Sequence, residues 1–329
     1  MVTAHNYSIS RCGPSRSNRT WTNKDRRKAP LIAAFFLYFL AALLEPDALA
    51  DPWPAAASGT NIGAGIGVFN AGFEASGLTY HPDRGYIVVG DDGDVAIVQS
   101  DASITDYQML GGDFEGITVK PHVADLAYIA SENLNAILEV SLSELSLTGK
   151  KWTLQIPQSG GLGFEGIAFV PADDAPASWG QGCCDGFFLA GTQADSALRV
   201  FDIDTSAGSD TTISPVTTIA TDYSDVSGLH FSSETGLLYV LHDTANRLTE
   251  MTLLGTKMAQ YVTPTSAAEE GIVIVPNCSL GTAAVSLADD GGPTVMQYGA
   301  YPISCDIVSN TAELSPAVLW LLIRGNPES

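Results

Sequence analysis

Short apolar runs alternate with polar turns along most of the chain, and this pattern is clearest in residues 225–251. Leu229–Phe231 and Leu237–Leu241 are apolar, and Arg247–Met251 alternates in polarity, with two turn-like segments between the runs. Three short strands at turn spacing predict one antiparallel sheet, the size of a propeller blade. Such a sheet cannot bury both of its faces alone, so the pattern predicts neighbouring copies.

The same pattern recurs in four other stretches, Ala75–Val98, Phe114–Val140, Phe164–Phe201 and Glu269–Tyr298. A glycine opens each copy, and the intervals between these glycines are 39, 50, 62 and 43 residues. The five glycines are Gly77, Gly116, Gly166, Gly228 and Gly271. A period near 40 with three or four short strands per copy predicts an all-β fold, a β-propeller of five blades. Six blades is the alternative, with a further blade inside the 62-residue interval; a β-sandwich fits the recurring turns less well.

The repeat divides the chain into four parts. Residues 1–50 precede it, and residues 51–72 form a linker with a candidate closing strand at Ile62–Phe69, expected to pair near the last copy. The propeller is predicted over residues 73–298, with a loop insertion at Ala172–Asp185 in its third copy. Residues 299–329 depart from the repeat and form a C-terminal extension.

The first 50 residues have the organisation of a secretory signal peptide. Seven Lys or Arg residues precede the uncharged, mostly apolar run Ala29–Leu44, and Ala48-Leu49-Ala50 resembles a cleavage site. We therefore expect an exported protein, periplasmic or secreted, that begins at Asp51. The alternative is an uncleaved segment that anchors the chain to the cell membrane, although 16 apolar residues are fewer than the usual ~20 of a spanning helix.

The net charge of the chain limits the partners that it is expected to bind. Removal of residues 1–50 leaves 8 basic and 34 acidic residues, a formal charge of −26 over 279 residues. Nucleic acid is excluded as an expected partner, because phosphate binding needs clustered Lys and Arg. A strongly negative chain attracts cations, and calcium is the cation that we expect.

Four cysteines remain after the signal segment, and an even number in an exported chain permits disulfide bonds. We favour a bond between Cys278 and Cys305, because both lie in the last copy and its extension. Cys183 and Cys184 are adjacent, and they could bond to each other or elsewhere. No Cys or His spacing indicates zinc.

The residue before each repeated glycine is the first candidate for site chemistry. These residues are Ser76, Glu115, Glu165, Ser227 and Glu270. Equivalent positions of a closed ring face one another, so three carboxylates and two hydroxyls should converge on the axis. Close like charges need a counter-ion or protons, and Ca²⁺ takes 6–8 oxygen ligands with tolerant geometry. We predict a calcium site here; the alternative is that the acids only cap adjacent turns.

A second polar series follows the next strand of each copy, and a few histidines lie near carboxylates. The series is Asp91 or Asp92, Glu132, Gln193, Asp243 and Asp290. It could form another layer at the channel, with Asp243 as a further metal ligand, or consist of ordinary turn residues. His230 falls within a strand and His242 precedes Asp243, whereas His81 and His122 fall in turns and are expected at the surface. Either of the first two could act as a general base, but a structural role is the simpler interpretation.

The motifs DVSGLHF, LLYVLHDTANRLTEMTLLG, EEGIVI, GFEGIAF and DFEGITV resemble the SdiA-regulated, YjiK-like β-propeller family. The resemblance covers residues 73–298 and implies an exported or membrane-associated bacterial propeller. Some members of that family are linked to calcium homeostasis, and the family implies no settled reaction. The long basic segment, the Cys-Cys loop and the residues after Tyr298 depart from the family pattern.

Three classes of function fit these observations. The first is an envelope propeller that binds calcium or another ligand, such as a small molecule or an envelope protein, in its central channel. The second is a calcium-dependent hydrolase, either a phytase-like phosphatase or a lactonase, which would use the channel carboxylates. A phosphatase would need cationic groups to hold phosphate, and the eight remaining Lys and Arg residues are scattered. The third is a protein-interaction scaffold.

Overall fold

The computed structural model of the protein describes residues 50–121, 125–157, 162–180, 182, 185–265 and 268–305. The predicted signal segment before Ala50, the Cys183-Cys184 pair and most of the C-terminal extension lie outside these residues. The described residues belong to one compact unit.

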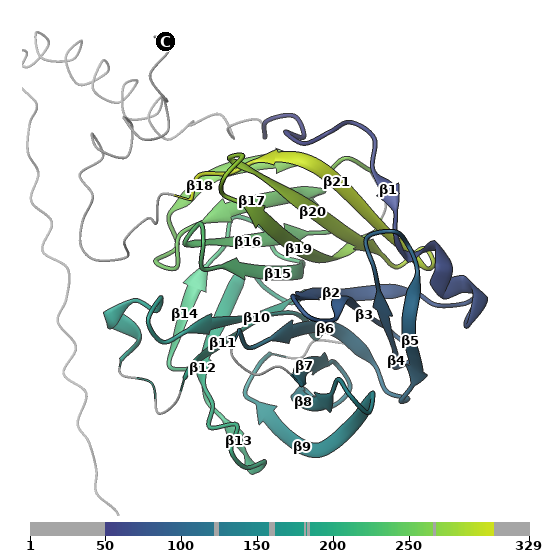
Figure 1. Cartoon of the computed structure of the whole chain (residues 1–329). Coiled ribbons are helices and arrows are strands. Elements are labelled where there is room, and N and C mark those ends of the chain that lie inside the picture. The colour runs from purple at the N-terminus through teal and green to yellow at the C-terminus, as the bar shows by residue number, and fades with distance from the viewer. Residues whose placement is uncertain are drawn as a thin grey trace, which may run out of the picture. The chain divides into compact units, whose positions relative to one another are not determined.

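The described strands form five mainly antiparallel sheets, the blades of a propeller (Figure 1). Blade 1 is β2 (Ala75–His81), β3 (Gly85–Gly90), β4 (Asp94–Val98) and β5 (Ile104–Met109). Blade 2 is β6 (Phe114–Val119), β7 (Leu126–Ser131), β8 (Ala136–Ser141) and β9 (Ser146–Leu154). Blade 3 is β10 (Phe164–Pro171), β11 (Gly186–Thr192), β12 (Ala197–Asp202) and β14 (Thr217–Ala220). Blade 4 is β15 (Val226–Ser232), β16 (Leu237–His242), β17 (Arg247–Met251) and β18 (Lys257–Val262), and blade 5 is β19 (Glu269–Asn277), β20 (Thr282–Asp289) and β21 (Thr294–Pro302).

The long third interval of the repeat does not contain a sixth blade, so that alternative is wrong. Part of its extra length is the insertion after β10, which includes the short 3₁₀ helix η3 (Ala177–Trp179). Another part is β13 (Ser209–Ile213), which leaves blade 3 and pairs in parallel with β9 at the outer edge of blade 2. The additional residues therefore connect two blades.

The hydrophobic core consists of five clusters, each between two adjacent blades. Tyr128 and Trp152 of blade 2, for example, pack with Phe188 of blade 3, and the other four clusters join the remaining pairs of neighbours. Strands β3 and β4 are buried along their whole length, because both of their faces pack against other blades. The outer strand β5 is half-buried to exposed, which explains its polar sequence ITDYQM.

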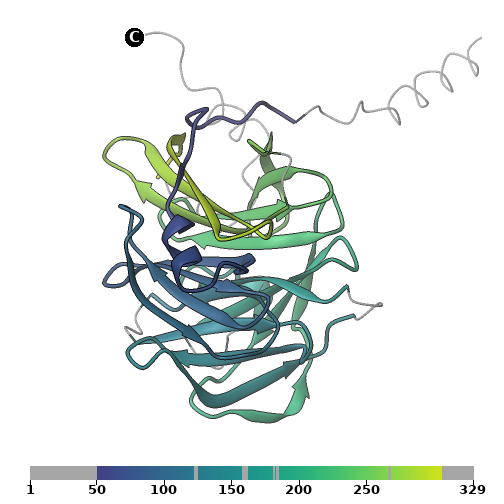
Figure 2. The same cartoon turned by 90° about the vertical axis from the view of Figure 1, so that its right-hand side faces the viewer.

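The ring closes through a strand from the segment before the repeat. This strand is β1 (Thr60–Asn61), which pairs antiparallel with Met296 and Gln297 of β21 (Figure 1). The strand expected at Ile62–Phe69 is instead the 3₁₀ helix η2 (Gly63–Val68), whose Ile66 is buried with Ile62 in the core between blades 5 and 1. Figure 2 shows η2 where the yellow last blade meets the blue first blade.

The end of the last blade lies beyond the predicted boundary, whereas its predicted disulfide bond is present. Strand β21 continues to Pro302, so the propeller extends four residues past the predicted end at Tyr298. The predicted disulfide between Cys278 and Cys305 is present and joins the β19–β20 turn to the residues after β21. Among the described residues, no helix has the length and apolar character needed to cross a membrane.

Candidate metal centre at the acidic mouth

The inner strand of every blade carries an irregularity at the same position. The pairing of the inner strand with its neighbour shifts register between Ala75 and Gly77, and the equivalent shift occurs in each of the other four blades. In blades 1, 2, 4 and 5 the residue inside the shift is the one before the repeated glycine. In blade 3 the shift spans both that residue and the glycine. A β-bulge redirects a side chain out of the regular alternation, so the bulges explain how this polar position is oriented differently from the strand residues that follow it.

The repeated glycines are required by the close approach of adjacent inner strands. A Cβ atom on Gly116 would lie 2.4 Å from the Glu165 carbonyl oxygen of blade 3, and one on Gly228 would lie 2.5 Å from the Glu270 carbonyl oxygen of blade 5. A Cβ atom on Gly271 would lie 2.8 Å from the Ser76 carbonyl oxygen of blade 1, and one on Gly166 would lie 3.0 Å from Leu229 Cγ of blade 4. The five glycines therefore surround one axis, as the sequence predicted.

Carboxylates gather where the inner strands begin, and we call this end of the channel the acidic mouth. Two groups of three have carboxylate oxygens within 4.8 Å of one another, namely Asp91, Glu115 and Glu270, and Asp113, Glu115 and Glu132. Glu115 belongs to both groups. Glu165 belongs to neither, so the expected set Glu115, Glu165 and Glu270 does not meet at a single point. Asp91, from the predicted second series, takes the place of Glu165.

The electrostatics of the acidic mouth favour neutral carboxyl groups when no cation is bound. Burial, followed by repulsion from Glu165 and Asp91, raises the pKa of Glu115. Burial, and next Glu132, raises the pKa of Glu165, although a hydrogen bond from Glu115 opposes this. Burial and the neighbouring Asp290 and Asp91 raise the pKa of Glu270 to about 9. The charged neighbours that act on these three groups are carboxyl groups, so the repulsion between them is relieved by protons or by a cation.

The other predicted metal ligands, Ser76, Ser227 and Asp243, make different interactions near the two close groups. The Ser76 hydroxyl donates a hydrogen bond to the Asp91 carboxylate, so it supports a member of the first group. The Ser227 hydroxyl donates to the Glu269 carbonyl oxygen at 2.9 Å and links blade 4 to blade 5. Asp243 repels Glu270, and burial and other carboxylates raise its own pKa to about 6. It therefore belongs to the mouth but to neither close group.

The second polar series lies at the acidic mouth through most of its members. Asp91 and Glu132 each belong to a close group, and Asp290 is the neighbouring charge that contributes most to the raised pKa of Glu270. The first of the two aspartates in blade 1 is therefore the relevant one, whereas Asp92 is exposed. For Gln193, the backbone carbonyl accepts a hydrogen bond from the Asp225 amide.

None of the histidines that the structure describes belongs to either close group. His242 is fully buried, its Nδ1 lies 3.4 Å from the Ser224 carbonyl oxygen, and its ring packs on Tyr223. Burial lowers its pKa to about 4, so it is a neutral structural residue at pH 7. The expectation that His81 lies at the surface is wrong, because only 5% of it is exposed; His122 lies outside the described residues.

Asp113 is a candidate metal ligand that the sequence analysis did not predict. It lies two positions before Glu115, and the equivalent position of blades 1 and 4 holds Glu74 and Asp225. This recurrence of acids was a usable signal. In blade 3 the same position is Gly163, where a Cβ atom would lie 2.2 Å from Glu132 Cγ. The absence of a side chain there gives Glu132 room to reach the mouth.

An apolar ring closes the channel directly after the acidic residues. The residue after each repeated glycine is aliphatic and at most 4% exposed. These residues, which we call the aliphatic girdle, are Leu78, Ile117, Ile167, Leu229 and Ile272. The space that they leave open to the centre of a water molecule is about 10 Å³, near the lower limit for one ordered water. Glu115, Ser227 and Glu270 line the same small space, so side chains nearly fill the channel at this level.

The close groups suit a hard divalent cation. They offer carboxylate oxygens without Cys or His, a donor set that favours Ca²⁺ or Mg²⁺ over zinc. Two oxygens bound to one Ca²⁺ at roughly 2.3–2.6 Å lie no more than about 5 Å apart, which matches the separation within each group. The residues present therefore fit a calcium ion.

Comparison with known proteins agrees with this fold. The model of the SdiA-regulated family matches residues 67–269. The crystal structure of Myxococcus xanthus glutaminyl cyclase is similar, with a TM-score of 0.50, 11% identity and coverage of 71% of this chain and 93% of the cyclase. Kuenenia stuttgartiensis hydrazine synthase gives a TM-score of 0.41, with 13% identity over 66% of this chain and 56% of the synthase. No curated protein matches in sequence.

Proposed function

The chain belongs to the SdiA-regulated family, and we propose that it is an exported propeller that binds calcium at the acidic mouth. One observation carries the calcium proposal. Asp91, Glu115 and Glu270 come from blades 1, 2 and 5, and their carboxylate oxygens lie within 4.8 Å of one another. Residues so distant in sequence meet only in the folded ring, so the bound ion stabilises the native state selectively. The proposal assigns no reaction.

Protons compete with calcium for the same oxygens. In the metal-free protein, burial and mutual repulsion keep protons on part of the cluster, as the raised pKa values of Glu115 and Glu270 indicate. Calcium binding must displace these protons, because the ligand is the ionised carboxylate. Calcium affinity should therefore rise with pH through the neutral range.

Thermal unfolding in EDTA and in millimolar calcium tests the proposal. At a calcium concentration of one hundred times the dissociation constant, binding adds about 2.7 kcal/mol to the free energy of unfolding. For a chain of this size that free energy corresponds to a rise in melting temperature of roughly 5 to 10 °C. Glu115→Gln removes the carboxylate shared by both groups, and it should abolish most of the rise.

Glu144→Gln is the matched control, because Glu144 is an exposed acid in the turn after β8, away from the channel. Its calcium-induced rise should equal that of the unaltered protein. If EDTA and calcium give the same melting curve for the unaltered protein, the acidic mouth holds protons and the calcium proposal is wrong.

The export proposal rests on residues 1–50, where a basic segment precedes an apolar run and an A-x-A site. Mass spectrometry of the protein recovered from periplasm or medium should give an N-terminus at Asp51. Recovery of the chain from membranes with residues 31–44 still attached would overturn cleavage and favour the anchored alternative.

A further inference from the structure

The opposite end of the channel is a second cavity, which we call the wide mouth. It has a volume of about 640 Å³, inside the roughly 300–1,000 Å³ range of small-molecule sites. All five blades contribute to its lining, at the ends of the inner strands and in the turns that follow, for example at Tyr80, Val119, Phe169, Phe231 and Ile274. The aliphatic girdle separates it from the acidic mouth.

The walls of the wide mouth combine aromatic and aliphatic side chains with hydrogen-bonding groups. Tyr80, Phe169 and Phe231 provide aromatic surface, and Thr79 and Thr118 provide hydroxyl groups. A wall of this composition suits the apolar body of an organic ligand better than a hydrated ion.

Two histidines in the lining are uncharged at neutral pH. Burial lowers the pKa of His230 to about 4, and a hydrogen bond with the Ile274 backbone only partly opposes this. Burial also lowers the pKa of His81, whose Nδ1 accepts a hydrogen bond from the Asp83 amide at 3.2 Å. Neither ring supplies a positive charge to the cavity at pH 7.

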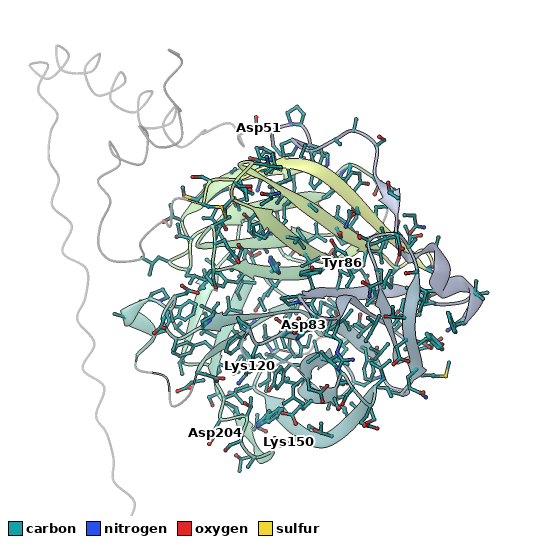
Figure 3. The ribbon with its side chains drawn as sticks, viewed as in Figure 1. Asp51, Asp83, Tyr86, Lys120, Lys150 and Asp204 are labelled. Carbon is teal, nitrogen blue, oxygen red and sulfur yellow. A yellow bond between two sulfur atoms is a disulfide. The ribbon has the colours of Figure 1, made fainter. Side chains whose placement is uncertain are left out.

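Lys120, labelled in Figure 3, is the one Lys or Arg among the described residues that line the cavity, and its charge is already used. Its Nζ lies 2.9 Å from the Asp185 carboxylate and 2.7 Å from the Thr205 hydroxyl. It also lies 5.1 Å from the centre of the Phe169 ring, and only 2% of the residue is exposed. An anionic ligand therefore finds no available cation in the wall.

The rim of the cavity has the opposite character, because Asp173 and Glu234 lie there with exposed side chains. The half-buried Asp174 also lines the cavity and accepts a hydrogen bond from the Ser233 hydroxyl at 2.6 Å. Carboxylates at the entrance of a cavity with aromatic walls complement a ligand with a positive head group. We propose that the wide mouth binds a small organic cation, an amine whose aromatic or branched aliphatic body enters the cavity while its ammonium group lies between Asp173 and Glu234.

A matched pair of probes tests this proposal in the purified protein. 4-Phenylbutylamine and 4-phenylbutanoate share one apolar body and differ in the sign of the head group. Calorimetric titration at pH 7 should show saturable binding of the amine and at least about tenfold weaker binding of the acid. The amine affinity should be the same in EDTA and in calcium, because the girdle separates the two sites.

Two kinds of variant locate the bound amine. The double change Asp173→Asn and Glu234→Gln should weaken amine binding about two- to fivefold, the range expected for exposed charge pairs. Val119→Trp fills the cavity from a half-buried position and should abolish binding. Glu144→Gln should not alter it.

Thermal melts of each variant establish that it is folded before titration. If Val119→Trp does not fold, Thr118→Tyr, at another lining position, replaces it as the occluding change. The proposal is overturned if neither probe binds, if the acid binds as tightly as the amine, or if amine binding survives both the folded occluding variant and the double neutral variant.

Discussion

The two mouths of the channel are built from the same five strands but offer opposite chemistry. At the acidic mouth, buried carboxylates of different blades lie within 4.8 Å of one another. At the wide mouth, which begins three residues further along the same strands at Thr79, Thr118 and Val273, the walls carry aromatic and aliphatic side chains, and the one lysine among the described lining residues is paired with Asp185. The difference shows that position along an inner strand sets the chemistry, whereas the ring symmetry sets only which residues meet.

The largest expected effect comes from Gly116→Ala, which should damage both mouths together. The new Cβ atom would lie 2.4 Å from the Glu165 carbonyl oxygen of the next blade, and a backbone group cannot move aside cheaply. We expect a loss of at least about 3 kcal/mol in the free energy of unfolding, or failure to fold. Denaturant unfolding measures the loss.

Gly299→Ala is the control for that change, because no atom lies within 4 Å of a Cβ atom built there. It should alter the free energy of unfolding by no more than about 0.5 kcal/mol. Equal stability of the two variants would contradict the close approach of the inner strands.

Leu229→Ala, a change in the aliphatic girdle, should lower the free energy of unfolding without abolishing ligand binding at either mouth. Leu229 is only 4% exposed and packs in the cluster between blades 3 and 4. Truncation should cost about 2 to 3 kcal/mol through lost burial and a residual cavity. Denaturant unfolding measures this cost, and calorimetry should show that calcium and the amine probe still bind. If the variant makes amine binding depend on calcium, the girdle is what insulates the two sites.

The free energy of unfolding of the metal-free protein should fall as pH rises, by less than the loss expected for Leu229→Ala. The folded-state pKa of Glu270 is about 9, above the ordinary value of 4.5 for a glutamate side chain. A raised carboxyl pKa contributes stability that is fully present below the unfolded value and is lost as pH rises through the folded value. Melting temperature in EDTA should therefore decline between about pH 5 and pH 9.

Glu270→Gln cannot ionise, and it should flatten that decline in EDTA. Added calcium should flatten it in the unaltered protein, because the cation stabilises the ionised form. A melting temperature that rises with pH in EDTA would mean that the carboxylates are not mutually destabilising.

The smallest effect is expected at the wide mouth from Lys120→Met. The side chain is 2% exposed and lies among three aromatic rings, and its partner Asp185 is 57% exposed. Removal of one partner of an ion pair is costly when the other charge stays buried. Asp185 is solvated enough to remain charged without Lys120, so we expect a change within about 1 kcal/mol by thermal unfolding. Binding of 4-phenylbutylamine should persist. Loss of its binding would show that the lysine, rather than the carboxylate rim, selects the ligand.

The propeller and the five glycine positions could be predicted because the repeat is directly visible in the sequence. Each glycine is fixed by a contact with the next blade, which every copy must satisfy. The exact carboxylate groups could not be predicted, because they depend on side-chain direction. Glu115 and Glu165 occupy equivalent positions, yet Asp91 approaches Glu115 and Glu270 while Glu165 does not join them.

The closing strand was predicted near the right place but assigned to the wrong residues. Ile62 and Ile66 are apolar because they fill the core between blades 5 and 1, and not because they lie in a strand. The two strand residues before them, Thr60 and Asn61, are polar and carry no strand signal. The wide mouth was also missed, since a cavity depends on how far side chains extend at the strand ends, which periodicity does not report.

Closure through β1 has a consequence for the order in which the protein assembles. The residues that complete blade 5 are separated by more than 230 positions, as in the hydrogen bond between Asn61 and Val295. A ribosome or secretion channel releases Thr60 early and β21 late, so the first-made strand must wait for the last. Pairing β1 with β21 closes a very long loop, and the entropy lost in this closure is offset only when the contacts between all five blades have formed. The join between blades 5 and 1 should thus form last and, under mechanical or thermal stress, open first.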